Sequence, residues 1–96
     1  MIRHTVVFKL KCPKGSPEEE EFFKQATTLS LIPVVHHFES LRQTSKKNDY
    51  DFGFSMEFES RIDYQKYNQH PDHINFVETY WKKYVDKFME IDYEPK

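Results

Sequence analysis

One short segment, residues 67–73, holds the residues best suited to chemistry, Tyr67-Asn68-Gln69-His70-Pro71-Asp72-His73. Pro71 bends the chain between two helical pieces, because proline lacks the N–H that would continue a helix. A histidine ring gains and loses a proton near neutral pH, and a tyrosine hydroxyl can orient that ring or stabilise an enolate oxygen. Tyr67 and His73 are therefore candidates for proton transfer beside a carbonyl group. His4, on the apolar face of the first predicted strand, is the third candidate.

The same segment also has a purely structural interpretation. In it, His70 or Asp72 caps the helix that follows Pro71, and the remaining rings only pack. A metal site is another interpretation of the five histidines, which are His4, His36, His37, His70 and His73. His70 and His73 are three positions apart, but Pro71 lies between them, and no HExxH motif or cysteine pair supports metal binding. We therefore expect no metal and no other cofactor.

Cys12 is the single cysteine of the chain, so an internal disulfide and a multi-cysteine metal site are excluded. A reducing, cytoplasmic setting fits this composition best. No base lies near Cys12 in the sequence, so we expect its thiol to be unreactive. The first residues run directly into a strand pattern, and no apolar stretch has the length of a signal core or a membrane span. We expect an untargeted protein without a membrane partner.

The composition indicates one domain, residues 1–96, because a chain of 96 residues can bury one hydrophobic core but not two. Nine Phe, six Tyr and one Trp must fill that core or line a cavity. The formal net charge is only -2, and acidic and basic residues mix along the chain. Such a surface lacks the basic field that binds a nucleic acid backbone, so no nucleic acid partner is expected.

Hydrophobic periodicity predicts four strands and three helices. Ser16 and Ser60 each stand three residues before an acidic residue, which is the pattern of a helix N-terminus. In the second strand, alternation predicts that the adjacent His36 and His37 point to opposite faces, with Phe38 on the face of His36. The predicted elements are strand 2–10, helix 17–31, strand 34–42, strand 52–58, helix 61–67, helix 72–87 and strand 88–93.

The order of these elements is β-α-β-β-α-β, which predicts an α+β fold with helices on one face of a four-stranded antiparallel sheet. The opposite sheet face also carries apolar side chains. An apolar surface of that size on a small monomer indicates an interface or a ligand site. We therefore predict a homodimer in which the sheets of two copies pack face to face.

The chain matches a known protein family over nearly its whole length, and four stretches carry the match. They are His4-Thr5-Val6-Val7-Phe8-Lys9-Leu10-Lys11, Glu20-Glu21-Phe22-Phe23-Lys24, residues 67–73 with their His-Pro-x-His core, and Ile91-Asp92-Tyr93-Glu94-Pro95. On these residues the chain resembles the stress-responsive A/B barrel domain family, whose members are dimeric α+β barrels. The resemblance implies a ferredoxin-like protomer whose sheet packs against that of its twin to enclose a barrel.

The resemblance also implies a function. The chain is similar to the plant polyketide cyclase of that family, in which a histidine and a tyrosine at the places of His73 and Tyr67 promote an aldol-type ring closure. By that resemblance His73 would be the general base of a cofactor-free enzyme acting on a small molecule, Tyr67 would orient it, and His4 would lie nearby. A pocket tyrosine of the cyclase aligns with Ala26 here, so the cavity must differ.

Two other functions stay open. One is a small-molecule binding or stress-protective protein that uses the same cavity without chemistry. The other follows related dimeric barrels that act as cofactor-free monooxygenases or bind haem.

Overall fold

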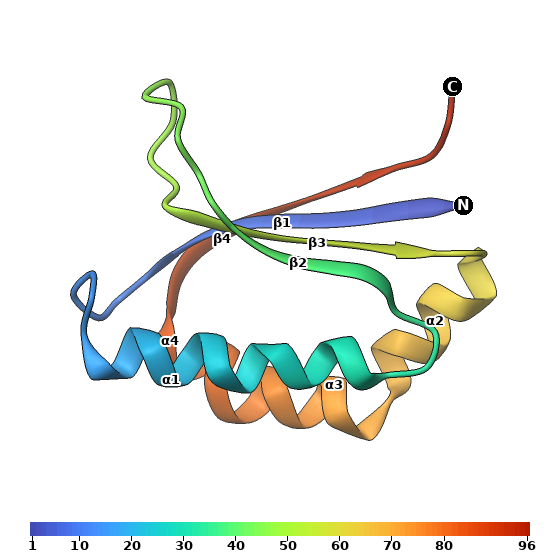
Figure 1. Cartoon of the computed structure of the whole chain (residues 1–96), viewed down its shortest axis with the longest axis horizontal. Coiled ribbons are helices and arrows are strands. Elements are labelled where there is room, and N and C mark those ends of the chain that lie inside the picture. Colours follow the sequence, from blue (N-terminus) through green and yellow to red (C-terminus); the bar gives the residue numbers. More distant parts are fainter.

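Four antiparallel strands form one sheet in the computed structural model, which describes residues 1–96. Their order across the sheet is β2-β3-β1-β4, so the first strand lies between the third and the last (Figure 1). This order confirms the ferredoxin-like β-α-β-β-α-β arrangement. The strands are β1 Ile2–Leu10, β2 His36–Arg42, β3 Phe52–Phe58 and β4 Val85–Tyr93.

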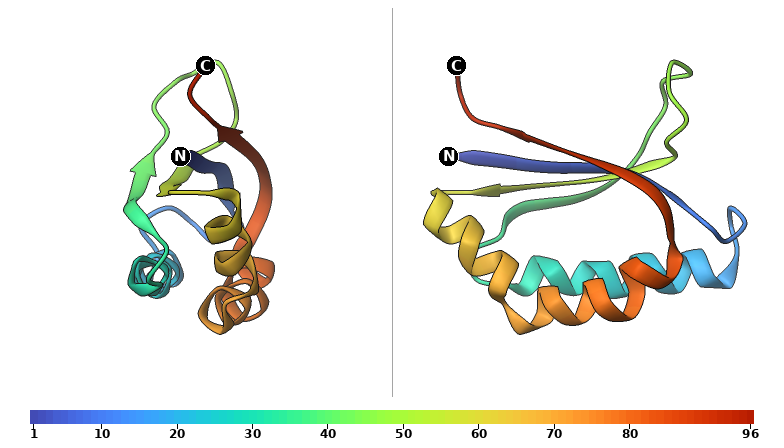
Figure 2. Two further views of the ribbon diagram at one scale, coloured as in Figure 1. Left: turned by 90° about the vertical axis from the view of Figure 1, so that its right-hand side faces the viewer. Right: turned by 180° about the vertical axis from the view of Figure 1, so that it is seen from behind.

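All of the helices cover one face of this sheet, as the two further views show (Figure 2). The first helical segment is α1, which continues as a 3-10 turn η1, and the second begins with α2 after β3. A π-helical turn, η2, interrupts the last segment before β4. The bounds are α1 Pro17–Ala26, η1 Thr27–Leu31, α2 Arg61–Gln69, α3 Pro71–Phe76, η2 Val77–Trp81 and α4 Lys82–Tyr84.

The helix N-termini follow the local sequence signals. The Ser16 hydroxyl accepts a hydrogen bond from the Glu19 N–H at 3.3 Å, and the Ser60 hydroxyl accepts one from the Asp63 N–H at 3.2 Å. Each bond satisfies a backbone donor that has no partner inside its helix. Both predicted N-caps are therefore confirmed.

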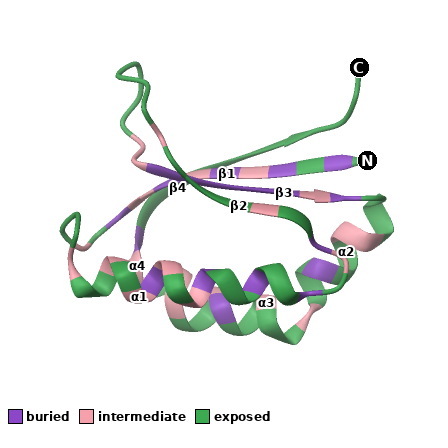
Figure 3. Cartoon of the chain, in the orientation of Figure 1, coloured by how far each residue is buried: buried purple, intermediate pink, exposed green.

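Aromatic rings form the centre of the core between the sheet and the helices. Phe8, Phe22 and Phe58 are completely buried, and Phe8 and Phe54 lie with ring centroids 4.8 Å apart. Figure 3 shows buried residues on β1, on β3 and on the helices that cover the sheet. Alternate residues of β1 are buried, since successive side chains of a strand point to opposite faces. His4 is among them, at 7% exposure.

Two details of the predicted elements are wrong. The last helix ends at Tyr84 rather than near residue 87, and β4 begins at Val85. In β2 the pairing register shifts between His36 and Glu39, and His37 takes a φ of 53°. This bulge adds one residue to β2, so both histidines approach Glu57: His36 lies opposite it in the ladder, and His37 Nδ1 lies 3.0 Å from its carboxylate.

The bulge also places Phe38 and His36 on different faces of the sheet, because Phe38 packs on Phe54 at 5.5 Å in the helix-covered core.

The sheet face away from the helices keeps several large apolar side chains at the surface. Those exposed by more than a third are Leu41, Met89, Ile91 and Tyr93. None of the helices combines the length and the apolar composition that a membrane-spanning helix needs.

Candidate functional site

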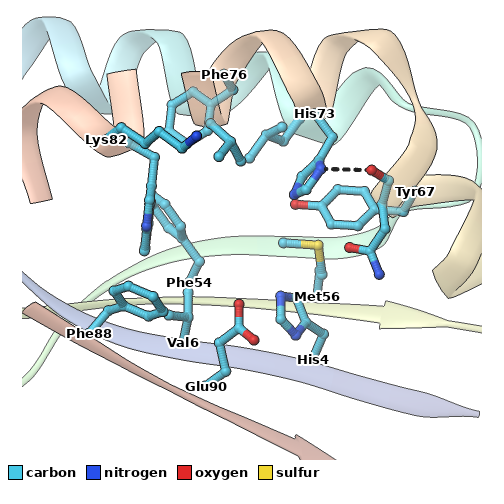
Figure 4. A pocket seen from close by; sticks show the side chains of 14 residues that line it. His4, Val6, Phe54, Met56, Tyr67, His73, Phe76, Lys82, Phe88 and Glu90 are labelled. Carbon is cyan, nitrogen blue, oxygen red and sulfur yellow. Dashed lines mark hydrogen bonds between the residues drawn. The ribbon is translucent and has the colours of Figure 1, made fainter. Parts of the chain in front are cut away.

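A cavity of about 370 Å³ lies between the sheet and the second helical segment. Its volume is in the range of small-molecule sites in proteins. Most of the polar groups gather at one end of the cavity, and Lys82 lies at the other end with several aromatic rings (Figure 4). The first end is lined by His4, Tyr67, Asn68, His73 and Glu90, and the apolar wall includes Val6, Phe54, Met56, Phe76, Trp81 and Phe88.

Tyr67 belongs to α2 and is only 2% exposed. Its ring packs against Phe58 at 5.1 Å and against the His73 ring at 4.3 Å, which fixes its orientation. The hydroxyl makes no hydrogen bond within the protein, and it points into the cavity beside His73 (Figure 4). Burial raises the pKa of this phenol well above its usual value, with a smaller contribution from the Glu90 carboxylate. Tyr67 is therefore a neutral hydrogen-bond donor directed at the cavity.

His73 lies on the first turns of α3, immediately after the bend at Pro71. Its Nδ1 is 3.3 Å from the Asn68 carbonyl oxygen, and a carbonyl can only accept, so Nδ1 carries the proton and donates. The other nitrogen, Nε2, then presents its lone pair. Burial lowers the pKa of His73 from 6.5, and the nearby His4 acts in the same direction. Near neutral pH the ring is therefore uncharged and able to accept a proton.

The bend itself is stabilised by His70. Its ring Nδ1 accepts a hydrogen bond from the Asp72 N–H at 3.1 Å and caps α3. The structural interpretation of the segment is therefore correct for His70, while His73 and Tyr67 meet at the cavity wall.

His4 reaches the same cavity from β1, on the wall opposite His73 (Figure 4). Its Nδ1 is 2.6 Å from Asp92 Oδ1, and the Tyr64 hydroxyl lies 2.9 Å from both Nδ1 and Asp92 Oδ2. Asp92 lies opposite His4 in the β1–β4 ladder, so both side chains project from the helix-covered face. Sequence reasoning missed Asp92 and Tyr64 as site residues, and only the register of β1 against β4 could have identified Asp92.

The structure brings together the three predicted site residues, His4, Tyr67 and His73, and leaves the other histidines elsewhere. His36 and His37 lie beside Glu57 and Glu59, on the opposite side of the sheet from the cavity or at its edge. No group of three or more histidine, cysteine or acidic side chains has the geometry to hold a metal ion. The arrangement supplies a base, a neutral donor and a second imidazole around one apolar cavity.

Comparison with known proteins shows which family the chain resembles. The model of the family described as the stress responsive A/B barrel domain matches residues 2–95. Among curated proteins, the olivetolic acid cyclase of Cannabis sativa is 30% identical over 99 residues, which cover 99% of this chain and 97% of the cyclase.

Solved structures agree. A Dabb family protein with a ferredoxin-like fold from Mesorhizobium loti superposes with a TM-score of 0.97 at 55% identity, covering 99% of this chain and 96% of that one. A ferredoxin-like protein of unknown function from Bacteroides fragilis, described as dimeric, superposes with a TM-score of 0.74 at 19% identity, covering 98% and 95% of the two chains.

Proposed function

The chain belongs to the stress-responsive A/B barrel domain family, and we propose that it is an enzyme that removes a proton from the carbon beside a carbonyl group, with His73 as the general base. One observation carries this proposal. The uncharged ring of His73 and the neutral hydroxyl of Tyr67 lie side by side on one wall of the cavity, with ring centroids 4.3 Å apart.

The proposed reaction follows from the protonation states of the two groups. His73 Nε2 takes a proton from the carbon, and the electron pair of the broken C–H bond moves onto the carbonyl oxygen. The Tyr67 hydroxyl donates a hydrogen bond to that oxygen as its negative charge develops. Beside the apolar wall the effective dielectric is lower than in water, which strengthens this hydrogen bond. The enolate can then attack an electrophile or regain its proton.

The cyclase relative supports the proposal, because a ring closure of polyketide type forms a bond at such a carbon. The resemblance noted from the sequence implies that a histidine and a tyrosine of that cyclase stand at the places of His73 and Tyr67. Ala26, which stands where the cyclase has a pocket tyrosine, is completely buried in the core. Ala26 does not line the cavity, and the proposal extends to the carbonyl chemistry but not to the substrate of the cyclase.

Deuterium exchange tests the proposal without knowledge of the natural substrate. The probe is 4-hydroxyacetophenone in D₂O, whose methyl protons lie beside a carbonyl and whose exchange is followed by ¹H NMR. Wild type is expected to accelerate exchange over buffer, and His73→Gln is expected to lower the accelerated rate by about 10²- to 10⁴-fold. His36→Gln is the matched control, because His36 lies away from the cavity, and it should leave the rate unchanged.

Exchange that is equally fast in His73→Gln would exclude His73 as the base. Saturable binding of the probe with no exchange above buffer would instead favour the non-catalytic binding function.

We further propose that the chain forms a homodimer through the sheet face away from the helices. The Bacteroides relative is described as dimeric, and here Leu41, Met89, Ile91 and Tyr93 are exposed on that face. Ile91→Lys should shift the sedimentation coefficient at micromolar concentration from that of a dimer to that of a monomer. Ile62→Lys is the control, because Ile62 is 65% exposed on α2 and lies outside this face. A monomeric wild type would contradict the proposal.

A further inference from the structure

A cluster of three hydrogen-bonded side chains joins β1, β4 and α2 at the edge of the cavity. His4 Nδ1, Asp92 and the Tyr64 hydroxyl contact one another at 2.6 to 2.9 Å. The proposed reaction uses neither Asp92 nor Tyr64, and no distance in the site is shorter than that between His4 and Asp92. The cluster therefore requires a role of its own.

The chemistry of the partners fixes where the protons are. An ionised carboxylate can only accept, so His4 Nδ1 must carry a proton and donate it to Asp92 Oδ1. The Tyr64 hydroxyl donates to Asp92 Oδ2, which leaves its oxygen free to share the His4 proton. When the His4 ring is neutral, its Nε2 is consequently unprotonated.

Packing holds the His4 ring at the cavity wall. Tyr64 stacks on the ring of Phe58 with centroids 4.9 Å apart and an interplanar angle of 6°, and the His4 ring lies 5.0 Å from Tyr64. The side chain of His4 is 8% exposed, and it lines the cavity. Nε2 has no hydrogen-bond partner in the protein and is not sealed from solvent. It therefore stands as an acceptor at the cavity wall.

We propose that Asp92 and Tyr64 are positioning residues that hold His4 as a hydrogen-bond acceptor towards the cavity, so that the ligand must present a hydroxyl group, phenolic or enolic, at that wall. This inference rests on the proposed function for the ligand's carbonyl group, which meets Tyr67 and His73. Together the three rings select a molecule with a carbonyl at one wall and a hydroxyl at the other. A carbonyl or ether oxygen in place of the hydroxyl has no proton to donate to Nε2. Two acceptors would then face each other without a hydrogen bond.

The ¹⁵N chemical shifts of the histidine rings test the position of the proton without any substrate. In wild type, with the His4 ring in its neutral form, Nδ1 is expected to be protonated and Nε2 unprotonated. In Asp92→Asn the amide can donate to Nδ1, so the proton should move to Nε2, as a carboxylate that orients a histidine predicts. Asp86→Asn, an exposed change on the same strand, should leave the His4 tautomer as in wild type. Protonated Nε2 in wild type, or an unchanged tautomer in Asp92→Asn, would overturn the proposal.

A pair of probes tests the ligand. Wild type should bind 4-hydroxyacetophenone about tenfold more tightly than 4-methoxyacetophenone, and Asp92→Asn should lose this preference, with affinities measured by titration calorimetry. Equal affinities in wild type, or binding of neither probe, would refute the hydroxyl requirement. The tautomer and the probe preference are measured without turnover, whereas the exchange rate of His73→Gln reports on catalysis. The two proposals can therefore fail separately.

Discussion

Two tyrosines of the same helix make opposite predictions when their hydroxyl groups are removed. Tyr67 has no hydrogen-bond partner within the protein, whereas the Tyr64 hydroxyl lies 2.9 Å from both Asp92 and His4. Tyr67→Phe keeps the packing against Phe58 and deletes only a desolvated polar group. Its free energy of unfolding should therefore stay within about 0.5 kcal/mol of wild type, or rise.

Tyr64→Phe should cost stability. A hydrogen bond to a charged group contributes roughly 1.5 to 3 kcal/mol when it is fully buried. The Asp92 side chain is 39% exposed, so solvent competes and we expect a loss of about 1 kcal/mol. For a domain of this size that loss lowers the melting temperature by roughly 4 to 8 °C. Tyr67→Phe should move it by less than about 4 °C on the same scale.

Function should show the reverse order. Tyr67→Phe removes the donor to the developing enolate oxygen, so the exchange rate of 4-hydroxyacetophenone should fall by about 10²- to 10³-fold. Stability is measured by urea unfolding at one fixed protein concentration, because self-association contributes to apparent stability. A loss of more than about 2 kcal/mol in Tyr67→Phe would show that its hydroxyl has a structural partner. A neutral Tyr64→Phe would show that its hydrogen bonds to the site contribute nothing.

Three further predictions concern pH, capping and close packing. Burial lowers the pKa of His73 in the folded state below 6.5. The contribution of His73 to stability is therefore complete above about pH 6.5 and is lost as the pH falls towards the lowered pKa. The free energy of unfolding of His73→Gln, measured with urea from pH 7.5 to 5.5, should depend less on pH than that of wild type. Ser60→Ala removes the acceptor of the Asp63 N–H and should cost about 1 kcal/mol in the same assay. Thr44→Ala, at an exposed position in the loop after β2, should be nearly neutral. Gly53→Ala places a Cβ 3.3 Å from the Val6 carbonyl oxygen, a backbone atom that cannot rotate away. The melting temperature of this variant should therefore fall. An unchanged melting temperature would mean that β1 and β3 separate easily.

Much of the fold could be predicted from the sequence because its signals are local. Alternating apolar residues mark β1 and β3, and Ser16 and Ser60 mark helix starts, since each pattern needs only a few neighbouring residues. The bulge at His37 breaks the alternation in β2 without any glycine or proline to announce it. The prediction that His36 and His37 point to opposite faces failed for that reason.

The site was predictable in part for the same reason. Tyr67 and His73 are six positions apart and share one bend, so the sequence already places them near each other. Asp92 is separated from His4 by 88 positions and Tyr64 by 60. Their meeting depends on how β4 pairs with β1, and no short stretch of sequence specifies a register between distant strands.

Because β1 lies between β3 and β4, one edge of β1 has no partner until the last strand has been synthesised. At roughly 5 to 20 residues per second, translation delivers Asp92 about 4 to 18 s after His4. Until β4 is available, the edge of β1 that pairs with it is bare, and the apolar side chains of β1 lack the cover of the last helix. An exposed strand edge of this kind attracts other chains. The nascent protein is therefore most prone to aggregate just before its last strand emerges, and a chaperone that shields β1 over those seconds should raise the yield of native protein.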